Sequence, residues 1–124
     1  MEESNIIAHL EIFVSENLIV HCDITPNTEI SIGRGQEADI VLPVQSLSKK
    51  HCIFRSFDNS VELQDLGSRN GTSVNSLRIY DNVCLHNSDV VRIGHVIINV
   101  IIYSQENTVL KNDSEIKNDS DIYI

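Results

Sequence analysis

The chain has 124 residues and a mass of 13.9 kDa, with 9 basic and 18 acidic residues and a formal net charge of -9. This length predicts a single domain, and the excess of acidic residues argues against a protein that follows a long nucleic acid, which needs a basic surface. The longest apolar run, residues 96–102, is much shorter than the roughly 20 residues that cross a bilayer, and the first residues, Met-Glu-Glu-Ser, do not resemble a secretory signal.

Short β-branched runs separated by turn residues predict an all-β protein built as an antiparallel two-sheet sandwich or a barrel. In chain order, the predicted strands are residues 6–14, 18–22, 29–32, 39–42, 52–57, 60–66, 83–85, 90–93 and 95–103. In residues 52–57, Ile53, Arg55 and Phe57 lie on one face and alternate with the residues of the other face. We expect strands with this alternation to bury one side only. Residues 58–60 predict a tight hairpin, and no stretch has the period of a helix.

The composition changes after Tyr103. Residues 105–124 are rich in Asn, Asp, Ser and Glu, and Lys-Asn-Asp-Ser occurs at 111–114 and again at 117–120. We therefore expect a domain over residues 1–104, followed by an acidic flexible tail over residues 105–124. A linker toward a further C-terminal part is the alternative.

The cysteines do not form a metal-binding pattern. Cys22, Cys52 and Cys84 are widely spaced and make no Cys-x-x-Cys pair, and the five histidines are equally scattered. We expect these cysteines to be small, buried apolar side chains of a protein in a reducing, intracellular compartment. Neither a metal nor another cofactor is predicted.

Three loops contain most of the unusual residues, and each follows a predicted strand. The first loop is residues 31–35, Ser-Ile-Gly-Arg-Gly; the second is 43–51, Pro-Val-Gln-Ser-Leu-Ser-Lys-Lys-His; the third is 66–72, Leu-Gly-Ser-Arg-Asn-Gly-Thr. Their basic residues lie within residues 33–78, which carry six basic and five acidic residues, whereas residues 1–32 carry six acidic residues and no Lys or Arg. Positive charge and fixed donors are what a phosphate group requires.

The order and spacing of these motifs resemble the forkhead-associated (FHA) domain family. The chain has Gly-Arg, then Ser-x-x-His, then Asn-Gly, with Ile-x-Leu between the first two and Leu-x-Asp-Leu before the third. The resemblance covers about residues 28–103 and includes Val-Val-Arg-Ile-Gly at 90–94. It implies a β-sandwich of about eleven strands, with loops at one end that bind a phosphothreonine peptide.

The resemblance also implies a role for each loop residue. Arg34, Ser48 and Lys49 are expected to contact the phosphate, because they offer a planar set of donors, a hydroxyl and a compact charge. Arg69 stands where the family more often has Thr or Ser, so its side chain either adds a contact or points to solvent. Asn70 is expected to bind the peptide backbone, and the alternative is a turn residue with positive φ.

The Ser-x-x-His spacing does not predict catalysis. The chain has no Gly-x-Ser-x-Gly nucleophile motif and no phosphate-binding loop that ends in Gly-Lys-Ser or Gly-Lys-Thr. The resemblance implies instead that His51 hydrogen-bonds the loop backbone and that Gly33 and Gly71 serve backbone geometry. We therefore expect a protein that is not an enzyme.

The loop sequences are also similar to those of FHA domains in nuclear chromosomal and DNA-damage checkpoint proteins. This similarity implies a nuclear adaptor in cell-cycle or checkpoint signalling. We expect a monomer or weak homodimer that binds a phosphothreonine-containing protein, with no direct nucleic-acid binding and no membrane partner. Two alternatives stay open. One is a phosphate-independent oligomerisation or interaction domain, and the other is the regulatory segment of a larger kinase or transcription factor.

Overall fold

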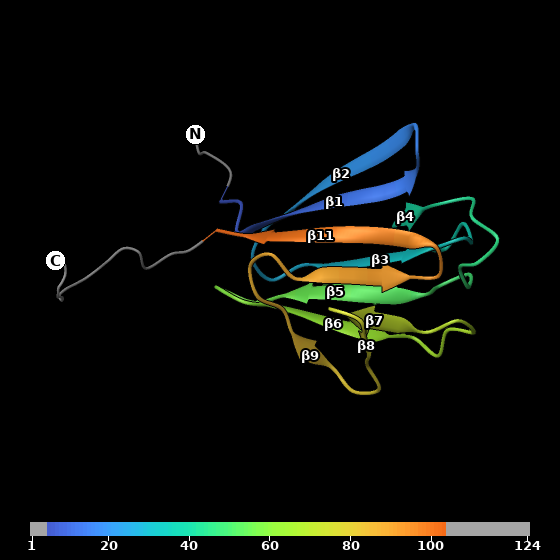
Figure 1. Ribbon diagram of the computed structural model, residues 1–124. Coiled ribbons are helices and arrows are strands. Elements are labelled where there is room, and N and C mark those ends of the chain that lie inside the picture. Colours follow the sequence, from blue (N-terminus) through green and yellow to red (C-terminus); the bar gives the residue numbers. More distant parts are fainter. Residues whose placement is uncertain (1–4, 104–124) are drawn as a thin grey trace, which may run out of the picture.

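The protein is a sandwich of two β-sheets (Figure 1). The structure, a computed structural model, describes residues 5–103, so the predicted tail lies outside the described residues. The strands are β1 (Ala8–Ser15), β2 (Leu18–Ile24), β3 (Glu29–Gly33), β4 (Ile40–Val41), β5 (Cys52–Ser56), β6 (Val61–Asp65), β7 (Thr72–Val74), β8 (Leu77–Arg78), β9 (Val83–Cys84), β10 (Val90–Ile93) and β11 (Val96–Ile102). Within residues 5–103, no helix is long and apolar enough to cross a membrane.

One sheet has the order β2-β1-β11-β10-β7-β8 and the other has the order β4-β3-β5-β6-β9. The prediction of an antiparallel sandwich is confirmed except for one pair, since β3 and β4 run parallel. The Asp39 carboxylate accepts hydrogen bonds from the Ser31 backbone N–H at 2.9 Å and from the Ser31 hydroxyl at 3.2 Å. These bonds place Asp39, the residue before β4, beside the middle of β3, so β4 runs in the same direction as β3.

The core lies between the sheets and consists of the side chains on one face of each long strand. In β5, Cys52, Phe54 and Ser56 are buried while Ile53 and Arg55 are only partly covered, which is the alternation expected of a half-buried strand. The buried apolar side chains of the other strands of five or more residues are Ala8, Leu10, Ile12, Ile24, Ile32, Val61, Leu63, Val96, Ile98 and Val100. Loop residues Leu42 and Leu47 join this core, which anchors the second loop to the sandwich.

The prediction that all three cysteines are buried is confirmed only for Cys52. Cys22 is half-buried and Cys84 is exposed.

The sequence missed β7 and β8. Both strands are very short, and they are joined by Asn75 and Ser76, whose φ angles are 51° and 74°. Two consecutive residues with positive φ form the kind of tight turn that joins antiparallel strands. Three residues are too few for a periodic pattern, so this hairpin becomes visible only through its pairing with β10.

All three loops lie at one end of the sandwich, on the right in Figure 1. They follow β3, β4 and β6, and the turn between β10 and β11 lies at the same end. Ala8 of β1 pairs with Ile102 of β11 at the opposite end. The sandwich therefore presents residues that are far apart in the sequence on one loop-bearing surface.

Phe54 and Phe57 provide a test of the core. Phe54 is 1% exposed and Phe57 is 43% exposed. We expect Phe54→Ala to lower the free energy of unfolding by about 3–5 kcal/mol, because it leaves a cavity, and Phe57→Ala to have a much smaller effect. Urea denaturation of both variants measures the difference, and equal losses would contradict this placement of the core.

Candidate functional site

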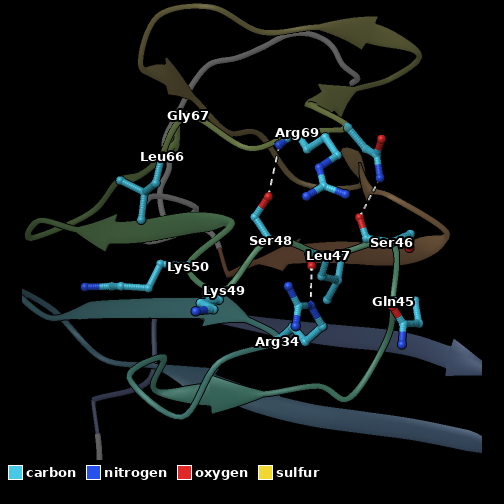
Figure 2. A pocket seen from close by; sticks show the side chains of 11 residues that line it. Arg34, Gln45, Ser46, Leu47, Ser48, Lys49, Lys50, Leu66, Gly67 and Arg69 are labelled. Carbon is cyan, nitrogen blue, oxygen red and sulfur yellow. Dashed lines mark hydrogen bonds between the residues drawn. The ribbon is translucent and has the colours of Figure 1, made fainter.

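The three loops surround one hollow of about 360 Å³, called here the loop-end hollow (Figure 2). It is lined by Arg34, Gln45, Ser46, Leu47, Ser48, Lys49, Lys50, Leu66, Gly67, Arg69 and Asn70. All five residues predicted to contact a phosphopeptide are among them. Lys50 also lines the hollow and was not among the predicted site residues, although it directly follows Lys49.

The loop-end hollow is positively charged. Four of its lining residues are Arg or Lys and none is Asp or Glu. Among residues 5–103, the carboxylates that contact a basic side chain do so in the pairs His9–Asp23, Arg55–Glu29 and His86–Asp89, so no carboxylate described in the structure pairs with these four cations. A concave surface with charges of one sign attracts ligands of the opposite sign, here an anion.

Arg34 is held by the backbone of the second loop. Its Nε donates to the Leu47 carbonyl at 2.9 Å, and its backbone N–H donates to the Ser48 carbonyl at 2.9 Å. A guanidinium has five N–H donors, so the bond from Nε orients the group and leaves the four terminal donors for a ligand. Figure 2 shows the Arg34 and Arg69 side chains reaching into the hollow from different loops.

Ser48 joins the second loop to the third. Its Oγ accepts a hydrogen bond from the Arg69 backbone N–H at 2.9 Å. Because the oxygen is the acceptor in this bond, the Ser48 hydroxyl hydrogen is available to a ligand. The same bond occupies the main-chain donor of Arg69, so the side chain is what Arg69 contributes to the hollow.

Asn70 makes a second connection between the same two loops. Its Nδ2 donates to the Ser46 carbonyl at 2.8 Å. The positive φ of this turn lies at Gly71, where it is 84°, and not at Asn70, so the alternative of Asn70 as a left-handed turn residue is wrong. The Ser46 hydroxyl oxygen accepts a hydrogen bond from the His95 backbone N–H at 3.0 Å, which connects the second loop to the turn between β10 and β11.

His51 is buried beneath the hollow and bridges the second and third loops. The Ser48 backbone N–H donates to its Nδ1 at 3.1 Å, so Nδ1 is the unprotonated nitrogen. Nε2 then carries the hydrogen and donates to the Gly71 carbonyl at 2.8 Å. Both ring nitrogens are engaged with backbone, and His51 does not line the hollow.

Asp65 organises the third loop from within. Its carboxylate accepts hydrogen bonds from the Gly67 and Ser68 backbone N–H groups at 3.0 Å each, from the Thr72 hydroxyl at 2.7 Å, and from the Ser68 hydroxyl. Burial by itself would raise the pKa of Asp65, but the hydrogen bonds from Ser68, Thr72 and Gly67 outweigh it and lower this pKa. The sequence reasoning missed this network, although Asp followed by Ser three residues later is a turn signal.

Gly33 allows β3 and the second loop to approach closely. A Cβ at Gly33 would overlap the Lys49 carbonyl, lying 2.7 Å from its carbon. The Gly35 backbone N–H donates to the same Lys49 carbonyl at 3.0 Å. A side chain at position 33 would therefore push Lys49 away from Arg34.

His51→Leu tests the bridge between the loops. The substitution leaves the Ser48 N–H and the Gly71 carbonyl buried without partners, and each loss costs about 1–3 kcal/mol. We expect the free energy of unfolding to fall accordingly, measured by urea denaturation. The control is His95→Leu, which changes an exposed ring, and an equal effect of the two variants would contradict the bridge.

The lowered pKa of Asp65 predicts a pH dependence. A carboxylate whose pKa is lower in the folded state stabilises the protein above its unfolded pKa, about 3.9, and this contribution is lost as the pH falls through the folded value. The difference in unfolding free energy between wild type and Asp65→Asn should be largest near neutral pH and shrink below about pH 4. A difference that stays constant down to pH 2 would contradict the charge-stabilised turn, and Asp58→Asn, at an exposed position, is the control.

The chain is similar to bacterial proteins with related sequences. FhaA and the glycogen accumulation regulator GarA, both of Mycobacterium tuberculosis, are each 41% identical to it over 64 residues, which is 52% of this chain. The match spans 12% of FhaA and 39% of GarA, so the chain corresponds to less than half of either relative. These bacterial relatives do not support the predicted placement among nuclear checkpoint adaptors.

Solved structures share the whole fold. The FHA domain of CT664 from Chlamydia trachomatis has a TM-score of 0.73 and 28% identity, covering 79% of this chain and 99% of that one. The FHA domain of FhaA, solved in complex with the intracellular domain of Rv3910, has a TM-score of 0.67 and 31% identity, covering 75% of this chain and 98% of that one. The model of the FHA domain family matches residues 30–94, more than half of the chain and all three loops. The chain therefore belongs to the FHA domain family.

Proposed function

We propose that this chain binds phosphothreonine-containing peptides in the loop-end hollow, with Arg34, Ser48 and Lys49 as the phosphate contacts. One observation carries the proposal: four cations from three loops line a single hollow, and no carboxylate of residues 5–103 neutralises them. FHA domains are readers of phosphorylated motifs and act as interaction modules. The activity is accordingly recognition of a partner protein without chemical change.

The donors are arranged for an anion with several acceptor oxygens. A phosphate monoester carries about −1.5 to −2 charges at neutral pH and three acceptor oxygens. Arg34 offers its terminal N–H groups in a fixed plane because its Nε is held by Leu47, and Ser48 offers an O–H whose oxygen is held by Arg69. Lys49 adds a mobile point charge at the exposed rim. The two oriented donors supply geometry, and the lysine supplies long-range attraction.

Asn70 extends recognition from the phosphate to the peptide backbone. Its Nδ2 donates one hydrogen to the Ser46 carbonyl, and this bond fixes the orientation of the amide. Among residues 5–103 the Oδ1 acceptor and the second hydrogen of Nδ2 have no hydrogen-bond partner, and because Asn70 is exposed, the main chain of an extended peptide can exchange hydrogen bonds with them. A phosphothreonine within a peptide is thus expected to bind more tightly than inorganic phosphate.

The cellular role is a narrower proposal. A role in signalling is supported by GarA, which is named as a regulator, and by FhaA, whose FHA domain binds the intracellular domain of another protein. The adaptor in nuclear checkpoint or cell-cycle signalling has only the loop similarity as its support. The same holds for nuclear localisation.

Arg34→Ala is the decisive variant. A hydrogen bond to a charged group contributes about 1.5–3 kcal/mol, so we expect the affinity for a phosphothreonine peptide to fall by about 10- to 150-fold. Fluorescence anisotropy with a labelled peptide measures this loss. The matched control is Arg55→Ala, which removes the same charge from β5, where Arg55 pairs with Glu29 away from the hollow.

The binding of the same peptide without the phosphate is measured as a second control. Equal binding of phosphorylated and unphosphorylated peptides, or equal affinities of wild type and Arg34→Ala, would contradict the proposal. Self-association that does not depend on phosphopeptide, measured by light scattering at several concentrations, would favour the phosphate-independent interaction domain instead.

A further inference from the structure

Two arginines outside the predicted site lie in one row on the solvent-facing side of the six-stranded sheet. Ser73 of β7 pairs with Arg78 of β8 on one side and with Arg92 of β10 on the other. Residues paired across neighbouring strands share a face, and neighbouring strands lie about 4.8 Å apart, so the two arginine backbones lie about 10 Å apart. The small side chain of Ser73 leaves room between them.

That room is a second hollow of about 180 Å³, called here the sheet-face hollow. Arg78 and Arg92 line it together with residues 71–73, Ser76 and Gly94, and Asn70 lines both this hollow and the loop-end hollow. The two hollows are therefore neighbours on either side of Asn70. A peptide whose backbone contacts Asn70 can reach both.

Arg78 is held in place on two sides. Its Cζ lies 5.6 Å from the centre of the Tyr80 ring, a cation–π arrangement. A Cβ at Gly71 would lie 2.6 Å from the Arg78 Nε, so the guanidinium packs against bare backbone. Gly71 thus serves both hollows, since its carbonyl accepts the hydrogen bond from His51 and its missing side chain makes space for Arg78.

The charges of this arginine pair are not neutralised by the part of the chain that the structure describes. Arg92 makes one long hydrogen bond, from Nε to the Gly94 carbonyl at 3.4 Å, and no ion pair among residues 5–103 involves Arg78 or Arg92. Arg55 on the opposite sheet differs, because it contacts both Glu29 and Gln64. Two like charges that flank a small hollow repel each other, and an anion between them relieves this repulsion.

We propose that Arg78, Ser73 and Arg92 form a second anion-binding subsite, which takes an acidic group of the same peptide that places its phosphothreonine in the loop-end hollow. The inference rests on the proposed function and adds a sequence preference to it. The acidic group lies within a few residues of the phosphothreonine, because the two hollows share Asn70. An Asp or Glu carboxylate and a second phosphate offer the same chemistry to the two guanidinium groups.

A peptide scan tests this preference. A phosphothreonine is fixed in an alanine-rich peptide, and Asp, Asn or a second phosphothreonine is placed in turn at every flanking position. We expect Asp to bind about two- to tenfold more tightly than Asn at one or two adjacent positions, since exposed charge pairs contribute modestly. A larger gain with the second phosphothreonine at those positions identifies a phosphate as the preferred group, and equal gains identify any anion.

Variants assign the preference to the arginine pair. Arg78→Gln and Arg92→Gln should each reduce the preference for Asp over Asn and leave the affinity for the Asn peptide nearly unchanged, whereas the control Arg55→Gln should change neither. Arg92→Glu should shift the preference from Asp to Lys at the same position. Thermal unfolding of each variant shows that it is folded, and Arg92→Gln replaces Arg78→Gln if loss of the contact with Gly71 destabilises the latter.

The results separate this inference from the proposed function. Phosphothreonine binding that depends on Arg34 but shows no preference for Asp at any position would overturn the second subsite alone. A preference for Asp that survives both Arg→Gln variants would also overturn it. No phosphothreonine binding, or binding that does not require Arg34, would overturn the proposed function and with it this inference.

Discussion

A buried imidazole holds the binding end of this sandwich together. His51 accepts from the backbone N–H of Ser48 and donates to the carbonyl of Gly71, so one ring joins two loops that are about twenty residues apart. A buried polar group without a partner is costly, and each of these backbone groups relies on the ring. The positions of Ser48, Arg69 and Asn70 at the surface follow from this bridge. The most important residue of the site is therefore one that does not line it.

Above this bridge, the donors of the hollow divide their hydrogen bonds between protein and ligand. Arg34 donates from Nε to the Leu47 carbonyl, and Ser48 Oγ accepts from the Arg69 backbone N–H. Each side chain keeps further donors for a ligand in the hollow. Groups that are already oriented lose less conformational entropy when a ligand binds. An acidic protein can hold a phosphate here because the net charge of -9 belongs to the whole chain, whereas every charged residue that lines the loop-end hollow is a cation. Salt screens the interaction between the hollow and acidic residues that lie more than about 8–10 Å from it.

Much of the fold and of the candidate site could be predicted from the sequence. Alternation in β5 predicted a strand that buries one side only, and the spacing of Gly33-Arg34, Ser48 and Asn70 indicated the family that the comparisons show. Which side is buried, that of Phe54, is a finding of the structure. The β7–β8 hairpin and the parallel pairing of β4 could not be predicted, because strands of two or three residues carry no period and Asp39 acts through a contact with Ser31. Lys50 was missed because a loop sequence does not state which way each side chain points.

By itself, the sequence determined the strand alternation, the turn residues and the order of the three loop motifs, because each of these is a local property of the chain. Only the tertiary structure decided which residues from distant parts of the chain lie next to one another. Ser73 lies between Arg78 and Arg92 because of the register of three strands, and a shift of one residue would move these side chains to the opposite face. The fold also brings Gly71 into contact with His51 of the second loop and with Arg78 of β8. Strand pairing joins residues that are distant in the chain, and its register depends on the packing of the whole sandwich, which no local pattern contains.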